Sequence, residues 1–597
     1  MLFRSVDAYR EYLDGLRALN SWRLRAADSA FARAIAIDST FALAYYKRSV
    51  AVGWQLGSDS TKSILADKAV TYIDRLPPRL QELVRGHSEL NRGFTAMERG
   101  DTAAIAPNFL AARARLARLV ASDSTDAEAW YALGDADYHL ALGSSYGRSV
   151  DSIAKYLTES LHGFTRTIQL DSTFHLAYEH LVQMYNTAAS PQSYVLLVGD
   201  TLKAGGTPAN ERKVGTPEQI NALREKAQTR GRVAAMGWVA SDPDAPDARR
   251  VLAEGYATSG QPDSAIAVWR EALKRPATAD PTFEWQIPLL KAREGMPSAG
   301  PELKAVMKRF SVDSVKTFGM ALRLSALMAS MSAGAQTGMP SIIDDASTLM
   351  VKSTPMFPAY GTNMPTAYIA NWYQNSLKVG MGLPMTSAVR SGLLGAIKGM
   401  SQLPPAVRDY SSPYLVYLAT RDTLFGNTAL RWAAASAPLP ELTAHLAITK
   451  GDSATALKIA KTFPTPDSLR HARLGLNGMR SVARAEVLAM LGNTRQAVET
   501  YETIQPVNMS RLNPDIGWPM YVRSFVARGR LYEQLGEREK AVASYEKFLA
   551  LWADAEAPMQ PQLREAREAI ARIKDSKADA KSVPVKGAVS PGAKGGR

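Results

Sequence analysis

Few residues of this chain stand at the spacings that catalysis requires. The stretch GSSYG, residues 143–147, fits the G-x-S-x-G pattern of a nucleophile elbow, in which serine occupies a sharp turn between a strand and a helix. The residues before it have helical periodicity, and no Asp–His pair stands where it could complete a triad. We therefore interpret this stretch as a loop of small residues between two helices.

Metal chemistry has an equally weak signature. His175 and Glu179 are four residues apart, so on a helix they share a face and could begin a metal site. No third ligand stands near them in the sequence, and the H-E-x-x-H motif is absent. The chain has no cysteine, which excludes disulfides, thiolate metal sites and iron–sulfur clusters. We predict neither a metal nor a cofactor.

Nucleotide chemistry lacks its motifs as well. The stretch SGLLGAIKGM, residues 391–400, contains glycines and Lys398, but not at the spacing of a phosphate-binding loop. A kinase needs a Gly-rich loop with its strand lysine, a His-Arg-Asp motif and an Asp-Phe-Gly motif, and the sequence contains none of them. The sequence therefore predicts that the chain is not an enzyme. An unrecognised catalytic site within residues 280–438 is the remaining enzymatic alternative.

The charge and hydropathy of the chain limit the classes of partner and the compartment that we expect for it. The formal charge is +14, of which residues 574–597 contribute +4, and no dense run of Lys and Arg occurs. We therefore expect no specific nucleic-acid partner. The first residues lack the apolar core of a signal peptide, and no uncharged apolar run reaches 18 residues. These features predict a cytoplasmic protein without a transmembrane span.

A repeated stretch of sequence indicates the helices that must position any site. Three copies of an apolar, Asp-Ser-Thr, Ala-aromatic pattern occur at residues 34–48, 119–133 and 167–181. Before the first copy, Ala27, Phe31 and Ala34 have the spacing of one helix face. We predict that Asp-Ser-Thr ends this helix and that the hydroxyl of Ser39 or Thr40 caps the next one. The sequence thus predicts antiparallel helix pairs with about 34 residues in each.

The residues of these pairs resemble the tetratricopeptide repeat. Trp130, Leu133 and Gly134 stand at signature positions of the first helix, and further units follow near residues 246–276, 448–463, 490–504 and 530–552. The resemblance implies an all-α, right-handed α-solenoid. The serine in each Asp-Ser-Thr corner replaces the proline that usually ends a unit.

A narrower resemblance concerns residues 6–51, 72–90 and 535–574. They are similar to the repeat region that follows the catalytic domain in bacterial eukaryotic-like serine/threonine kinases. This resemblance implies an alternative function, in which the chain is the sensor half of a signalling kinase. If such a kinase is anchored in a membrane, the chain would lie outside the cytoplasm.

Composition divides the chain into six expected segments. Helix pairs are predicted at 1–190, 218–279 and 439–573, with a hairpin or loop insert at 191–217. Residues 280–438 hold 12 of the 21 methionines and are predicted to form irregular helix pairs, in which Met fills packing gaps. Residues 574–597 are predicted to be a disordered basic tail.

The resemblance also implies a binding surface. In the repeat family, given positions of the first helix of each pair line a concave groove that holds a protein or peptide segment. Carried over to this chain, these positions are Tyr46, Trp54, Glu128, Tyr131, Asp135, Tyr138, Glu179, Gln183, Asn186, Arg523 and Arg530.

Function is predicted from the character of this groove. Its N-terminal part is aromatic and acidic, which favours a basic partner, and its C-terminal part is basic. Trp130, beside Tyr131, is predicted to be a core residue. We therefore expect a non-catalytic scaffold with a protein partner, and the sequence leaves its oligomeric state open.

Overall fold

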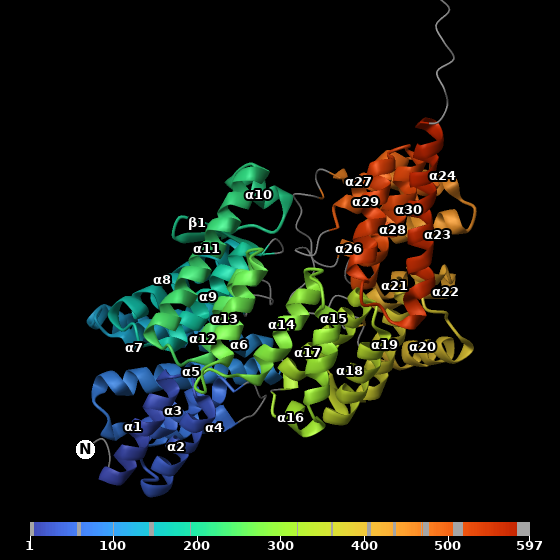
Figure 1. Ribbon diagram of the computed structural model, residues 1–597. Helices are drawn as coiled ribbons and strands as arrows, with labels where there is room; N and C mark the ends of the chain where they lie inside the picture. Colours follow the sequence, from blue (N-terminus) through green and yellow to red (C-terminus); the bar gives the residue numbers. More distant parts are fainter. Residues whose placement is uncertain are drawn as a thin grey trace, which may run out of the picture. The chain divides into compact units, whose positions relative to one another are not determined.

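The computed structural model is almost wholly helical (Figure 1). It describes residues 5–55, 61–99, 101–142, 149–190, 193–318, 320–359, 362–402, 408–433, 438–466, 469, 477–504 and 517–581. Its contacts group the chain into two compact units, residues 1–287 and 288–597. The finer division into six segments stays a prediction.

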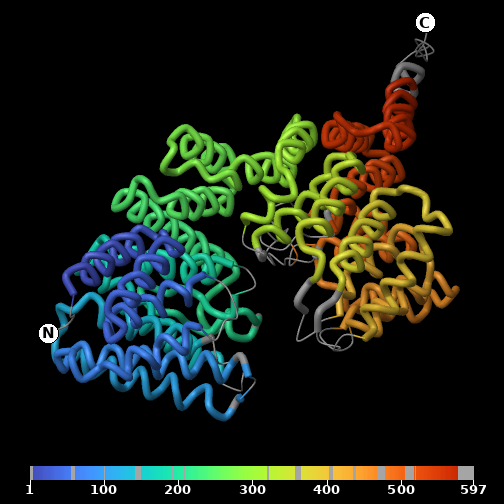
Figure 2. Tube along the Cα trace, turned by 90° about the horizontal axis from the view of Figure 1, so that it is seen from below, coloured from blue at the N-terminus to red at the C-terminus, as the bar shows by residue number. Residues whose placement is uncertain are grey.

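The first unit consists mainly of helices that pack in consecutive antiparallel pairs (Figure 2). Its elements are α1 (Val6–Asn20), α2 (Leu24–Ile37), α3 (Ala42–Gly53), α4 (Thr61–Thr71), α5 (Pro78–Arg99), α6 (Thr102–Ser122), α7 (Ala127–Leu142), α8 (Val150–Leu170), α9 (His175–Ala189), β1 (Val195–Val198), β2 (Thr201–Ala204), α10 (Pro208–Val214), α11 (Pro217–Ser241), α12 (Pro246–Thr258) and α13 (Pro262–Leu273). Helix α14 (Pro281–Arg293) contains the division between the units.

The second unit begins after this division and is also built mainly from helix pairs. Its elements are α15 (Ala299–Arg309), α16 (Val312–Lys316), α17 (Met320–Thr337), α18 (Pro340–Ser353), β3 (Met356–Ala359), β4 (Thr362–Pro365), α19 (Thr366–Gly380), α20 (Ser387–Met400), α21 (Ser411–Thr420), α22 (Thr423–Ala433), α23 (Pro440–Thr449), α24 (Ser453–Ala460), α26 (Asn477–Met490), α27 (Thr494–Glu502), α28 (Trp518–Gln534), α29 (Arg538–Leu551) and α30 (Gln560–Lys581). The predicted all-α array of helix pairs is confirmed.

The corners between pairs use Asp rather than the predicted hydroxyl. In the first corner, Oδ1 of Asp38 accepts hydrogen bonds from the backbone N–H of Thr40 at 3.0 Å and from its hydroxyl at 2.8 Å. The N-cap of α3 is Phe41, which makes no side-chain cap. The prediction that Ser39 or Thr40 caps the helix is therefore wrong, because the Thr40 hydroxyl is a donor to Asp38 within a local turn.

A glycine opposite an aromatic ring sets the approach of the two helices in three pairs. A methyl group on Gly15 would lie 2.5 Å from Cε1 of Phe31, which is fully buried. The same relation joins Gly93 to Phe109 and Gly529 to Tyr545, and each ring follows its glycine by 16 residues. We call these the glycine–ring contacts. Because glycine has no side chain, the ring can rest directly on the facing helix.

The insert near residues 191–217 contains the predicted hairpin. Strands β1 and β2 pair in antiparallel register with Val198 opposite Thr201, and Gly199 between them has a φ of +62°. The hairpin packs on α8, α9 and α11, and the Thr158 hydroxyl of α8 accepts the Leu202 N–H at 2.8 Å. Helix α10 follows it and was not predicted. At Thr216 a capping box starts α11.

Several methionines of residues 280–438 lie in the interior of the second unit. Met331, Met350 and Met381 are fully buried. The unit also closes on itself, since α17 packs on α28 and the Glu556 carboxylate accepts the Ser341 N–H at 2.9 Å. A second antiparallel hairpin, β3 and β4, lies where only helices were predicted.

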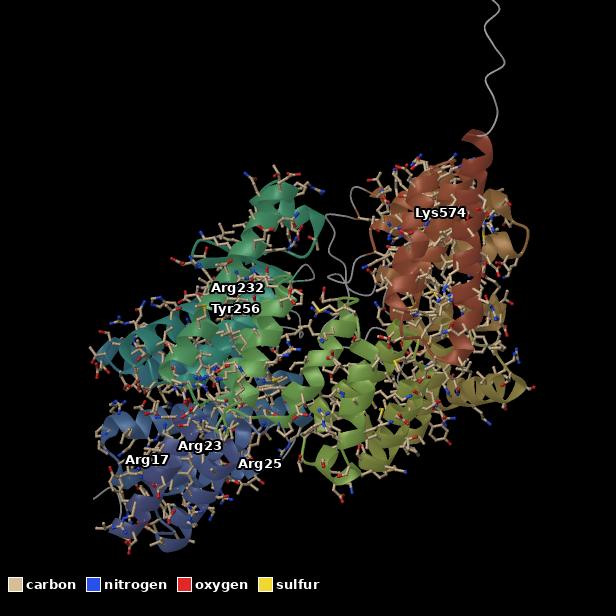
Figure 3. All side chains as sticks on the ribbon, viewed as in Figure 1. Arg17, Arg23, Arg25, Arg232, Tyr256 and Lys574 are labelled. Atoms are coloured by element: carbon tan, nitrogen blue, oxygen red, sulfur yellow. The ribbon has the colours of Figure 1, made fainter. Side chains whose placement is uncertain are left out.

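The C-terminal end of the chain differs from the prediction. Helix α30 continues to Lys581, past the predicted start of a disordered tail at 574, because Ala and Lys, which favour helix, are frequent there. The remainder of that tail, 582–597, and the loop 143–147 lie outside the described residues. Within the described part of the chain, no helix has both the length and the apolar character needed to cross a bilayer. Arg17, Arg23 and Arg25 are exposed around the corner between α1 and α2 (Figure 3).

Candidate functional site

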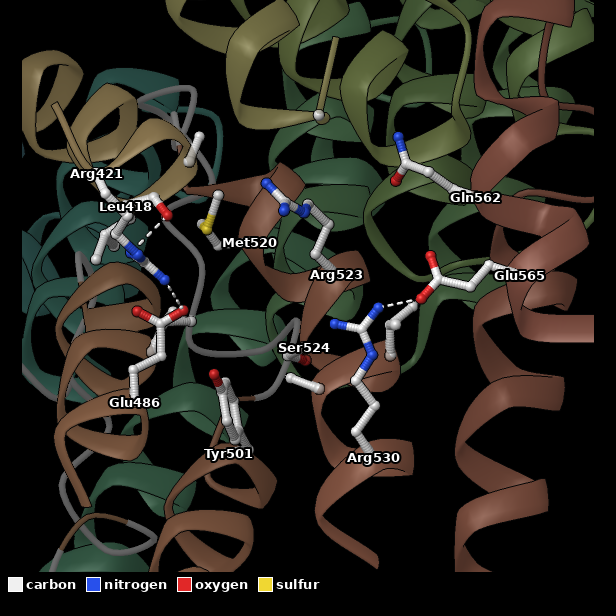
Figure 4. Close-up of a pocket in the computed structure, with 15 residues that line it drawn as sticks. Leu418, Arg421, Glu486, Tyr501, Met520, Arg523, Ser524, Arg530, Gln562 and Glu565 are labelled. Carbon is white, nitrogen blue, oxygen red and sulfur yellow. Dashed lines mark hydrogen bonds and ion pairs between the residues drawn. The ribbon is translucent and has the colours of Figure 1, made fainter. Parts of the chain in front are cut away.

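A polar cleft of about 400 Å³ opens in the second unit. This volume lies in the range of small-ligand pockets. Helices α21, α26, α27, α28 and α30 supply its walls (Figure 4). The polar and charged side chains of its lining are Arg421, Glu486, Tyr501, Arg523, Ser524, Arg530, Gln562 and Glu565. We call it the arginine cleft.

One wall of the arginine cleft is an ion pair that a buried histidine supports through a further contact. Arg421 donates through Nη2 to Oε1 of Glu486 at 2.8 Å and through Nη1 to the Leu418 carbonyl at 2.7 Å. The imidazole of His445 lies 3.0 Å from the other oxygen of Glu486, and its Nδ1 lies 2.8 Å from the Tyr417 hydroxyl. Burial opposes ionisation of Glu486, but His445 and Arg421 hold its pKa below the usual value.

The opposite wall carries a second pair at the solvent edge. Arg530 of α28 is bonded to Glu565 of α30, and both side chains are more than half exposed. Next to them, Gln562 donates to the Met381 carbonyl at 3.0 Å. A pair as exposed as Arg530–Glu565 adds little stability, so an incoming anion can compete for the guanidinium at small cost.

Arg523 lies between these two ion pairs (Figure 4). Its Nη1 donates to the Gly380 carbonyl at 3.1 Å. Of the residues that the structure describes, none brings a carboxylate oxygen within 4 Å of this guanidinium. Burial lowers the pKa of Arg523; Glu486 opposes this, and the nearby Arg421 and Arg530 lower it further. A partly buried guanidinium in this state gains from an anion that brings its own hydrogen-bond acceptors.

The arginine cleft therefore suits a carboxylate or another planar anion. Three guanidinium groups face two carboxylates in its lining, which leaves one positive charge unbalanced. The sequence placed Arg523 and Arg530 on a common surface, and the structure brings both into the cleft. It missed Arg421 and Glu486. Arg421 follows α21 in a corner of the irregular region, where no repeat register could be read.

In the first unit, the predicted groove residues meet one another in the interior. The Tyr46 hydroxyl donates to Oε1 of Glu128 at 2.9 Å, and the Lys47 ammonium lies 2.5 Å from the same oxygen. Burial would raise the pKa of Glu128, but Lys47 and Tyr46 lower it below its usual value. Tyr46 itself is only 5% exposed. This pair therefore links α3 to α7 across the inside of the helical array.

Trp54 and Tyr131 meet in the same interior. Their rings flank the His180 imidazole, with centroids 4.9 and 5.9 Å from it. Tyr131 is 8% exposed, whereas Trp130 is only half-buried and packs against the exposed His162. The predicted core position of Trp130 is therefore wrong: Tyr131 is the more buried of the two, because Phe164, Phe174 and His180 pack around its ring.

The remaining predicted residues of this unit continue along α7 and α9. The Tyr138 hydroxyl donates to Oε1 of Gln183 at 3.0 Å, and Gln183 donates to Oε1 of Glu179 at 2.6 Å. Glu179 is buried, Gln183 is exposed, and Asn186 is half-buried one turn further on. Asp135 lies beside His139 and His180. The sequence also suggested that His175 and Glu179 could begin a metal site. In the structure, Nδ1 of His175 instead faces Oδ2 of Asp242, at the end of α11, at a distance of 3.7 Å.

Comparison with protein families identifies one repeat in the second unit. A search of curated proteins finds no match. Among solved structures, the chain is similar to the crystal structure of yeast Tom70, with 12% identity, a TM-score of 0.27 and 97% of each chain covered. It is similar to the crystal structure of the APC/C hetero-tetramer Cut9–Hcn1, with 11% identity, a TM-score of 0.27, and 94% of this chain and 96% of that chain covered. Residues 522–551, which include most of α28 and all of α29, match the tetratricopeptide repeat family.

Proposed function

We propose that the chain is a non-catalytic scaffold that binds a protein segment, and that the arginine cleft takes an acidic group of that segment. Helix-pair arrays of this kind present concave surfaces for extended partners. The cleft lies beside the matched repeat, and α28 contributes Arg523 and Arg530 to both. Its volume of about 400 Å³ would hold one or two side chains or a chain terminus, which is less than a whole folded partner needs.

The observation that carries this proposal is Arg523. Its guanidinium is half-buried and, among the described residues, donates to one carbonyl, so the burial of its charge is only partly compensated. A ligand carboxylate would complete its bonding, with the Tyr501 and Ser524 side chains lining the same space. Arg421 and Arg530 would add charge on either side. The C-terminal carboxylate of a peptide or an Asp or Glu side chain fits this chemistry.

The test is a binding measurement with acidic peptides. An array of fluorescent peptides that carry Asp or Glu internally or at a free C-terminus is titrated with the full chain by polarisation. We expect Arg523→Gln to weaken the best binder by about tenfold or more, the size of one charged hydrogen bond. Arg538→Gln changes an exposed arginine of α29 outside the cleft and should leave affinity unchanged. Equal affinities for the two variants would refute the proposal.

The first unit is a second surface for the same scaffold function. Of its predicted groove residues, Tyr46, Tyr131 and Glu179 are buried and offer little area to a partner. A partner would therefore contact Trp54, Tyr138 and Gln183. Asp135, which no Lys or Arg among the described residues pairs with, keeps this side acidic, which would favour a basic segment. The sensor-kinase alternative rests on sequence resemblance alone, and no contact in the structure favours it.

A further inference from the structure

We propose that Asp135, His139 and His180 form a binding site for a zinc-like divalent metal ion in the first unit. The sequence predicted no metal here, and the scaffold proposal does not depend on one. Asp135 and His139 stand four residues apart on α7, and His180 projects from α9 of the next helix pair. One ligand atom from each of the three side chains lies within 4.8 Å of the other two.

The separations suit tetrahedral coordination. Oδ1 of Asp135 lies 3.1 Å from Nε2 of His139 and 3.4 Å from Nε2 of His180. Ligands at zinc distances of 2.0–2.2 Å in a tetrahedron are separated by roughly 3.3 Å. The two measured edges thus bracket that value. A metal ion can be accommodated by small side-chain rotations, without a shift of either helix.

The orientation of His180 supplies an independent argument. Its Nδ1 lies 3.1 Å from the Leu176 carbonyl, one turn back on α9, and an N–H there is the donor that a carbonyl oxygen requires. In the neutral ring, Nε2 then bears the lone pair, and this lone pair faces the Asp135 carboxylate. Such a contact is repulsive unless a cation lies between the two groups. Metal-bound histidines commonly have this arrangement, with the second nitrogen donating to a carbonyl.

The surroundings favour a cation and allow it to enter. Glu179 brings a second carboxyl group near His180, and its Oε2 is buried without a hydrogen-bond partner. His180 is 1% exposed and is enclosed by Trp54, Tyr138 and Phe164.

The side chains of Asp135 and His139 are 17% and 23% exposed, which leaves an approach from solvent. A water molecule from this side can complete the coordination.

The ligand set points to one class of metal. Two imidazoles and one carboxylate suit Zn²⁺, Co²⁺ or Ni²⁺, whereas Ca²⁺ and Mg²⁺ prefer oxygen ligands in larger number. The ion would join α7 to α9 and so lock one helix pair onto the next. The other occupant that the geometry permits is a proton, which would make His180 an imidazolium bonded to Asp135. The two occupants respond differently to added metal.

The experiment measures metal content and thermal stability of the full chain. The protein is stripped with a chelator, loaded with Zn²⁺, desalted and assayed by elemental mass spectrometry. We expect one zinc per chain and, at 100 times the dissociation constant, a rise of about 3–8 °C in the melting temperature of the first unit. Mg²⁺ should give neither. Co²⁺ should develop the visible absorption of a tetrahedral site.

Two variants and a control decide the outcome. Asp135→Asn and His139→Gln alter half-buried side chains that the fold should tolerate, and each should abolish stoichiometric zinc and the thermal shift. His162→Gln removes an exposed histidine on α8 and should retain both. The proposal is overturned if the stripped protein takes up no zinc, in which case the cluster holds a proton. It is also overturned if Asp135→Asn and His139→Gln, shown to be folded by circular dichroism, retain as much zinc as His162→Gln.

Discussion

Arg421 and Glu486 face each other across one wall of the arginine cleft, with Nη2 and Oε1 2.8 Å apart. Arg421 holds this position from a backbone with φ +62°, in the left-handed region that ends α21. Glycine is the residue most often found at such an ending, because a Cβ is strained there. The chain thus accepts local strain at the residue whose side chain forms the wall, which is a pattern of functional sites.

The strain at Arg421 can be measured by two substitutions. Both Arg421→Gly and Arg421→Ala remove the guanidinium, but only glycine fits the left-handed backbone without strain. We expect the glycine variant to be more stable than the alanine variant by about 1 kcal/mol in urea unfolding. Both should bind acidic peptides less tightly than the parent chain. Equal stabilities would show that the backbone leaves the left-handed region once the side chain is gone.

The glycine–ring contacts predict opposite effects for two Gly→Ala substitutions. At Gly93 in α5, the new methyl would lie 2.5 Å from the buried Phe109 ring, so Gly93→Ala should cost about 1–3 kcal/mol through overpacking. At Gly395 in α20, nothing lies within 4 Å, and the gain in helix propensity should stabilise the chain by about 0.5–1 kcal/mol. Thermal or urea unfolding reports both. A stable Gly93→Ala variant would contradict the close approach of α5 and α6.

Burial predicts that Tyr131 matters more to stability than its neighbour Trp130. Tyr131→Ala removes a ring that packs against Phe164, Phe174 and His180 and should cost about 3–4 kcal/mol. Trp130→Ala removes a half-buried ring whose indole N–H donates to the Ser124 carbonyl at 2.9 Å, and should cost about half as much. The urea midpoints of the two variants give the comparison. The reverse order would restore the assignment of Trp130 to the core.

The first unit should lose stability in mild acid through His87. Burial lowers the pKa of His87 to about 4, while the unfolded chain takes up its proton near 6.5. Between these values the unfolded state binds more protons, so the free energy of unfolding falls as pH decreases from 6.5 to 4. The full loss is on the order of 3 kcal/mol. His87→Gln should flatten the dependence of the urea midpoint on pH over this window, and His162→Gln should leave its slope in place.

Local pattern was enough to predict much of the fold. The face formed by Ala27, Phe31 and Ala34 is buried as expected, since helical spacing alone decides it. The run from Val195 to Leu202 forms the hairpin that its β-branched and apolar residues indicate. The corner at Asp38 shows the limit of such reading, because several polar side chains competed for the same backbone groups and only geometry settles which one wins.

The candidate sites depend on contacts that no local pattern contains. Asp135 and His139 carried a readable signal, four residues apart on one helix, but their third partner His180 comes from the next pair. Arg421 and Arg523 are about a hundred residues apart and meet only because the second unit curves back on itself. The curvature of an array is the sum of the packing angles of many helix pairs, so no single repeat determines the depth of a groove.

The glycine–ring contacts also bear on the order in which the chain folds. Each joins residues only 16 positions apart, so closing that loop costs little entropy and the pair can form before its neighbours exist. Assembly can then start at Gly15, at Gly93 or at Gly529 and spread outward from each. Refolding from urea should accordingly show several kinetic phases, and a chain still emerging from the ribosome could fold its first pair while the remainder is being made.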